Sequence, residues 1–234
     1  MIEERIQTVL SEIEAARKRR TRVPQEAPVQ LVAMTKNHGV DAMREAIDAG
    51  MTDIGENRVQ EAMEKHRILD RSVKWHLVGH LQTNKAKQAV QMFDMIHSVD
   101  SVHLAQAVNR AAGAVSKVQE ILVQVNLAKE ESKFGVYREN LDELIREVRG
   151  MPHLKLRGLM CIAPEYEDPE MCRPLFREMY DIFRAMQGGP LGAEIEYLSI
   201  GMTCDYPIAV EEGANIVRIG TAIFGKRIYK KQGE

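Results

Sequence analysis

The sequence predicts an α/β fold, specifically a single (β/α)8 TIM barrel with an N-terminal helix. Eight short runs rich in valine, isoleucine and leucine are separated by segments of helical length. Most of these runs lack strict alternation of apolar and polar residues, which is typical of parallel strands covered on both faces. Eight strands alternating with helices in 234 residues fit one barrel domain that spans residues 1–234.

The expected elements follow one another regularly along the chain. The N-terminal helix is predicted by an apolar face made of Ile2, Ile6, Val9 and Ile13. The strands are expected near residues 29–35, 52–55, 73–79, 94–98, 119–126, 155–161, 195–200 and 215–220. Apolar residues at three- and four-residue spacing predict helices between them, as in residues 141–148. Glycines that suit helix C-termini are Gly50, Gly113, Gly150 and Gly213.

A doubly wound open sheet is the rival architecture. A dinucleotide-binding sheet of that kind would carry G-x-G-x-x-G after its first strand. Here the first strand runs into residues 35–39, TKNHG, which is no dinucleotide loop. The barrel is therefore the favoured fold.

Charge and composition point away from nucleic acid and membranes. The net charge is −2, and the one basic run, residues 17–22, follows the N-terminal helix, where cations suit the helix dipole. We therefore expect this run to be a solvated helix end. No 18 consecutive residues are apolar, so no membrane-spanning helix is expected.

The cysteines and the N-terminal acids indicate a reduced, cytoplasmic chain. The three cysteines are far apart and form no C-x-x-C. Acidic residues at positions 3, 4, 12 and 14 argue against a signal peptide or a mitochondrial presequence.

Polar residues gather where the expected strands end. In a barrel the carboxyl ends of all the strands lie on one face, and chemistry gathers there. Reading those ends in order gives Lys36, Asn57, His80, His97, Asp100, Asn126, Met160, Ser199, Gly201, Arg218, Gly220 and Thr221. The sequence therefore predicts a polar site on that face.

Lys36 is the most informative of these residues. A partly desolvated lysine has a lowered pKa and, as a neutral amine, can form a Schiff base with an aldehyde. The alternative is a lysine that extends from the strand end into solvent. The loops after strands seven and eight carry glycine with serine or threonine, which suits a phosphate. A lysine opposite a phosphate site is the arrangement that pyridoxal phosphate requires.

Arg218 is the second informative residue. Its guanidinium keeps its proton at any ordinary pH, so on the pyridine nitrogen it would donate a hydrogen bond and leave that nitrogen unprotonated. The ring would then be a weak electron sink. The alternative is an arginine paired with an acid inside the barrel.

Two other motifs do not support a site. His76 and His80 are four residues apart on an expected strand, with no third ligand nearby, so zinc is not expected. Residues 220–226 match G-x-x-x-x-G-K, but Arg227 stands where a magnesium-binding hydroxyl belongs.

The chain resembles the pyridoxal phosphate homeostasis proteins, the YggS/PROSC family, from about residue 29 to residue 227. The matching segments are 31–36 (LVAMTK), 54–62 (IGENRVQEA), 75–85 (WHLVGHLQTNK), 96–100 (IHSVD), 123–126 (VQVN), 130–136 (EESKFGV), 156–160 (LRGLM), 198–202 (LSIGM) and 217–225 (VRIGTAIFG). Two loops depart from the family pattern, at residues 37–39 and 203–206.

The resemblance implies a barrel like the N-terminal domain of alanine racemase that binds pyridoxal 5′-phosphate. It implies Lys36 as the Schiff-base lysine and Arg218 at the pyridine nitrogen. Around the phosphate it implies Ser199, Gly201, Gly220 and Thr221, with Asn57, His80 and Met160 lining the rest. It further implies a cofactor carrier, a monomer or weak homodimer, that meets enzymes needing the cofactor only transiently.

Two function classes follow, a non-catalytic binding protein for intracellular cofactor homeostasis and an amino-acid racemase of the alanine racemase type. Racemisation needs a base on each face of a planar intermediate, and no tyrosine stands at any expected strand end. The sequence also ends soon after the last strand, so a second domain that closes the site is not expected. Both points favour the binding protein. A lyase or deaminase is a weaker third class, since Arg218 limits carbanion stabilisation.

Overall fold

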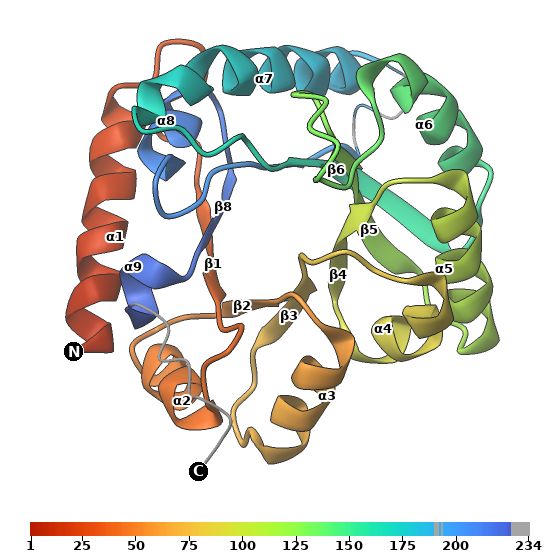
Figure 1. Cartoon of the computed structure of the whole chain (residues 1–234), viewed down its shortest axis with the longest axis horizontal. Coiled ribbons are helices and arrows are strands. Elements are labelled where there is room, and N and C mark those ends of the chain that lie inside the picture. The colour runs from red at the N-terminus through yellow and green to blue at the C-terminus, as the bar shows by residue number, and fades with distance from the viewer. Residues whose placement is uncertain (190–191, 193, 226–234) are drawn as a thin grey trace.

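Eight parallel strands form a closed barrel in the computed structural model, which describes residues 1–189, 192 and 194–225. Each strand pairs with its neighbours in chain order, and β8 closes the barrel by pairing with β1 (Figure 1). The strands are β1 (Gln30–Met34), β2 (Asp53–Glu56), β3 (Lys74–Leu77), β4 (Met95–Val99), β5 (Gln119–Val125), β6 (Leu154–Cys161), β7 (Tyr197–Ser199) and β8 (Ile216–Ile219).

Helices form an outer ring around these strands (Figure 1). They are α1 (Ile2–Lys18), α2 (Val40–Asp48), α3 (Val59–Ile68), α4 (Ala86–Met92), α5 (Val102–Ala114), α6 (Leu141–Arg149), α7 (Arg173–Gln187), α8 (Tyr206–Glu211) and α9 (Thr221–Phe224). The predicted fold class, a (β/α)8 barrel with an N-terminal helix, is confirmed. The expected domain of residues 1–234 includes 226–234, which lie outside the described residues, as do Lys226 and Arg227 of the rejected phosphate motif.

Two apolar layers build the core. Alternate residues of a barrel strand point inward and outward, so Val32 and Met34 of β1 belong to one cluster and Leu31 and Ala33 to the other. The inner cluster consists of Val32, Met34, Val78, Met95, Leu122, Met160 and Ile216. The outer, larger cluster lies between strands and helices, and a well-packed interior of this kind makes the barrel a rigid support for its loops.

Helix α1 packs against α8 and α9, beside the seam where the barrel closes (Figure 1). The basic run after it is not simply a solvated helix end, which corrects the sequence-based expectation. Arg20 is buried, and its guanidinium donates to the carbonyl oxygens of Val210, Ala214 and Ala27 at 2.9, 2.8 and 2.7 Å. Val210 lies in the last turn of α8, which ends at Glu211, and its carbonyl also accepts from the Gly213 N–H at 3.2 Å, so Arg20 ties the segment after α1 to the C-terminus of α8.

The helix-ending glycines are confirmed in three places. Gly150 directly follows α6, and Gly50 and Gly213 follow α2 and α8 with φ of 98° and 115°, a backbone conformation that favours glycine. The expectation for Gly113 is wrong, because this residue lies inside α5, and the left-handed turn falls on Ser116 with φ of 53°. In the described part of the chain, no helix is long and apolar enough to span a bilayer.

Candidate functional site

A pocket of about 590 Å³ opens at the carboxyl ends of the strands. Six of the nine predicted site residues line it, namely Lys36, Asn57, His80, Arg218, Gly220 and Thr221. Met160 is fully buried beneath it, in the inner cluster with Met34 and Val78, which do line the pocket. The segments that follow seven of the strands, all but β4, contribute to the lining, so the site is assembled from segments far apart in sequence.

Lys36 stands two residues beyond β1, half-buried at the pocket wall. Helix α3 holds the backbone on both sides of it. The Lys65 ammonium donates to the carbonyl of Thr35 at 2.7 Å, and the N–H of Asn37 donates to the Glu61 carboxylate at 2.6 Å. Asn37 has a left-handed φ of 63°, so the chain turns sharply just after the lysine.

Lys65 is the centre of a buried polar cluster behind Lys36. Its three ammonium hydrogens have three acceptors at 2.7 Å, which are the Thr35 carbonyl, Glu56 Oε1 and Glu61 Oε1. Glu56 is fully buried, and burial raises its pKa although the Lys65 charge opposes this. Glu56 Oε2 has no hydrogen-bond partner among the described residues, so the cluster depends heavily on Lys65.

Arg218 lies at the inner end of the pocket, and only 2% of it is exposed. It donates to the carbonyl and the hydroxyl of Ser199, both at 2.7 Å, and to the carbonyl of Cys161 at 3.0 Å. Its hydrogen-bond acceptors are therefore neutral oxygens rather than the carboxylate of a paired acid. Burial lowers the pKa of Arg218 to about 10, which leaves the group charged at neutral pH.

The Ser199 hydroxyl is fully buried and faces two side chains rather than the pocket. Besides accepting from Arg218, it lies 3.1 Å from Nδ1 of His97. His97 Nε2 lies 2.9 Å from His76 Nδ1, and His76 Nε2 lies 2.9 Å from Asp53 Oδ1. The sequence placed His97 at a strand end but gave it no role, and it left His76 and Asp53 unassigned.

Gly201 shapes the loop after β7 rather than lining the pocket. Its φ is 95°, and a Cβ atom there would stand 2.7 Å from the Cβ of Ala209. The loop is closed by Asp205, whose carboxylate accepts from the N–H of Met202 at 2.6 Å. Burial raises the pKa of Asp205. Thr203 of the same loop lines the pocket, and sequence reasoning gave it no role.

Gly220 and Thr221 form the wall where β8 ends and α9 begins. The first N–H groups of a helix have no acceptor inside the helix, so they are available to an anion. Thr221 adds an exposed hydroxyl. This wall is therefore suited to a phosphate group.

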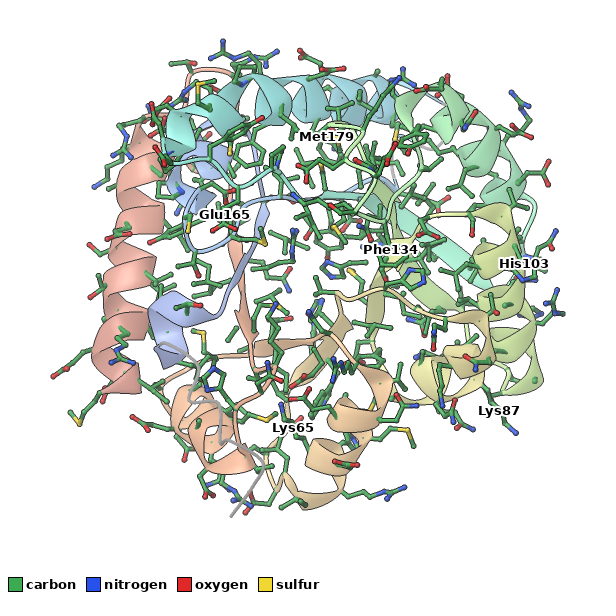
Figure 2. The ribbon with its side chains drawn as sticks, viewed as in Figure 1. Lys65, Lys87, His103, Phe134, Glu165 and Met179 are labelled. Atoms are coloured by element: carbon green, nitrogen blue, oxygen red, sulfur yellow. The ribbon has the colours of Figure 1, made fainter. Side chains whose placement is uncertain are left out.

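An aromatic pair forms part of the pocket wall. The ring of His80 stacks on Phe134, with centroids 3.6 Å apart and planes 10° from parallel. Phe134 lies in a loop held by Asn126, whose amide donates to the carbonyls of Glu130 and Lys133 at 2.9 and 3.0 Å. Phe134 and Glu165 lie within the ring of helices in Figure 2, and both line the pocket.

Tyr166 is a further lining residue that the sequence reasoning missed. It lies in the loop after β6, beyond the strand end where a tyrosine was sought, and 43% of it is exposed. In the described residues, no group of three or more His, Cys, Asp or Glu is arranged to hold a metal ion.

Fold and site together define a barrel of the alanine racemase class. The family model "Alanine racemase, N-terminal domain" matches residues 12–228. The alanine racemase of Clostridium difficile 630 is 14% identical with a TM-score of 0.70, and the match covers 94% of this chain and 57% of that one. At this identity the likeness concerns the fold alone.

More similar proteins identify the family within this class. The pyridoxal phosphate homeostasis protein of Aquifex aeolicus is 40% identical, with 97% of this chain and 98% of the relative covered. That of Escherichia coli K12 is 37% identical, with 96% of each covered. The chain belongs to the pyridoxal phosphate homeostasis protein family, as the sequence motifs predicted.

One similar protein has been solved both without and with bound PLP. PipY of Synechococcus elongatus PCC7942 without PLP is 37% identical with a TM-score of 0.85, and PipY with PLP bound is 36% identical with a TM-score of 0.84. In each case 96% of this chain and all of the PipY chain are covered.

The cluster around Lys65 yields a stability prediction. Lys65→Met should lower the free energy of unfolding by about 3–5 kcal/mol, because it removes the cation from a buried carboxylate. Lys87→Met is the matched control. Lys87 is exposed on α4, and Figure 2 shows it on the outside of the molecule. Lys65 is instead a buried residue of α3. The control should change stability by no more than about 0.5 kcal/mol. Urea denaturation measures both, and equal small losses would contradict the prediction.

Proposed function

We propose that this protein binds pyridoxal 5′-phosphate in the pocket, holds it as a Schiff base on Lys36, and stores or hands over the cofactor without substantial turnover of amino acids. The observation that carries the proposal is the arrangement of three groups around one cavity: a half-buried lysine, a buried arginine cation and a glycine-threonine wall at a helix start. Family membership and the PLP-bound PipY structure support it.

The residues present fit such a cofactor. Its aldehyde supplies a group that condenses reversibly with amines, and Lys36 offers the amine. The Gly220 and Thr221 backbone and the Thr221 hydroxyl would hold the phosphate, while Arg218 would donate to the ring nitrogen. Asn57 and His80 would line the remaining walls, with Met160 supporting the inner end through Met34.

The structure leads us to propose a different role for two predicted phosphate contacts. The Ser199 hydroxyl is engaged by Arg218 and His97, so we propose that Ser199 acts through Arg218. Gly201 is needed for the turn above α8, so we propose that it shapes the loop while Thr203 lies nearer the ligand.

Racemase activity is the second candidate, and one observation favours it. Tyr166 lines the pocket from the loop after β6, whereas Lys36 lines it from the segment after β1. The pocket therefore contains a hydroxyl that could serve as the second base. Against this, Arg218 at the ring nitrogen limits electron withdrawal, and the exposed position of Tyr166 leaves water in the site. We therefore favour the carrier.

Lys36 is expected to be the covalent attachment point. Borohydride reduction of the protein saturated with cofactor, followed by peptide mapping, should label Lys36, because this lysine lines the same pocket as the proposed phosphate wall of Gly220 and Thr221. Lys36→Ala should lose the near-visible absorption band, while Lys133→Ala, at another lysine of the same pocket, should retain it. Labelling of Lys133 with Lys36 unmodified would refute the assignment.

Thr221 is expected to discriminate between phosphorylated and unphosphorylated ligands. Thr221→Ala removes a hydrogen bond to a charged group, worth about 1.5–3 kcal/mol, so affinity for pyridoxal phosphate should fall by about tenfold or more. Affinity for pyridoxal should be unchanged, which makes it the internal control. Equal effects on both ligands in a titration would place the phosphate elsewhere.

The carrier proposal predicts little turnover and ready release. Typical enzymes run at about 1–10³ turnovers per second, and chiral analysis of alanine, serine and other small amino acids should show rates far below that range. The loaded protein should also activate an added apo-enzyme that needs the cofactor. Sustained racemisation that is lost in both Lys36→Ala and Tyr166→Phe would instead establish the racemase.

A further inference from the structure

A chain of buried side chains crosses the barrel interior from Arg218 to Asp53. It passes from β8 through Ser199 on β7, His97 on β4 and His76 on β3, and ends on β2. The successive donor–acceptor distances are 2.7, 3.1, 2.9 and 2.9 Å. Every member is at most 5% exposed, so water does not compete for these hydrogen bonds.

The direction of the first two hydrogen bonds follows from donor and acceptor chemistry. A guanidinium can only donate, so the Ser199 oxygen accepts from Arg218. The hydroxyl has one hydrogen of its own, and its remaining partner is Nδ1 of His97. That hydrogen is satisfied only if Nδ1 carries no proton and accepts it.

The two histidines then have defined tautomers. Burial, together with the neighbouring His76 and Arg218, lowers the pKa of His97 well below its ordinary value, so the ring is neutral. Because Nδ1 accepts from Ser199, the single ring proton of His97 lies on Nε2. Nε2 therefore donates to Nδ1 of His76. His76 in turn carries its proton on Nε2 and donates to the Asp53 carboxylate.

The chain ends on an ionised carboxylate. Burial of Asp53 acts to raise its pKa, but hydrogen bonds from His76, Thr52 and Gln30 outweigh it and the pKa is lowered. The Thr52 hydroxyl and the Gln30 amide donate to Asp53 at 2.7 Å each. Four donors in series thus point from a buried cation to a buried anion.

We propose that Ser199, His97, His76 and Asp53 are positioning residues that form one directed hydrogen-bond chain and hold the Arg218 guanidinium fixed at the inner end of the pocket. Three hydrogen bonds to Ser199 and Cys161 leave two of its five N–H groups for a ligand. The consequence for cofactor affinity rests on the proposed function, whereas the order of protons in the chain does not.

The opposite polarity is the alternative arrangement. His76 would then be a cation that donates to both Asp53 and His97, and His97 would donate to Ser199. The Ser199 hydroxyl hydrogen would lose its acceptor, and a second buried cation would join Arg218. Both features cost free energy, so the directed chain is favoured.

Histidine-selective ¹⁵N NMR on the ligand-free protein at neutral pH tests the order of protons. His76 and His97, assigned with His76→Asn and His97→Asn, should both be neutral and protonated on Nε2. His103, exposed on α5 and on the outside of the molecule in Figure 2, serves as the reference for a solvated ring. Protonation of Nδ1 on either ring, or a cationic His76, overturns the proposal.

Ser199→Ala and Ser199→Thr test the positioning role. The alanine variant breaks the chain, so the His97 Nδ1 resonance should move and affinity for pyridoxal phosphate should fall by about tenfold or more. The threonine variant keeps the hydroxyl and should restore both. Unchanged affinity in Ser199→Ala overturns the role, and if that variant does not fold, the wild-type tautomers decide. If the wild-type protein binds no pyridoxal phosphate, the proposed function fails while the NMR result stands.

Discussion

The burial of the Arg218 guanidinium is the constraint on which the rest of the site depends. An unpaired charge inside a barrel costs several kcal/mol in lost hydration, so the structure must supply compensating groups. It does so with three oxygen acceptors and with a hydrogen-bond chain that reaches Asp53 across five strands. Ser199, His97, His76 and Asp53 are thus linked to one cation, and they occupy inward positions that an ordinary barrel fills with branched apolar side chains.

Lys36 is supported by a separate set of charges outside the barrel wall. Lys65 and Glu61 lie on α3 and bind the peptide groups on either side of Lys36, while Glu56 at the end of β2 completes the cluster. The lysine side chain itself remains half-buried at the pocket wall. The two groups that we propose to hold the cofactor, Lys36 and Arg218, thus have independent supports, so a change in one network is expected to leave the other in place.

The fold and the strand-end residues were predictable from sequence because both follow from local pattern. Apolar runs and helical spacing are properties of neighbouring residues, and barrel topology then places every strand end on one face. The roles of Ser199 and His97 were not predictable, because they depend on which way each side chain points and on register between strands. The pairing of β4 with β5 shifts between Ile96 and Val99, so inward positions around His97 cannot be counted from the strand start. Tyr166 and Phe134 lie in loops whose course depends on tertiary contacts.

The distribution of burial around the pocket bears on whether the site suits a carrier. Its inner end is built from rigid parts, since Arg218, Ser199 and Met160 are buried in strands. Its mouth is built from loops, where Phe134 and Tyr166 are 54% and 43% exposed. Surface loops generally open at lower free energy than buried strands do. A ligand held by fixed groups at its inner end and covered only by loops can be recognised specifically and still be exchanged. An enzyme needs the mouth closed against water during the reaction, whereas an exposed mouth suits the holding and release that we propose.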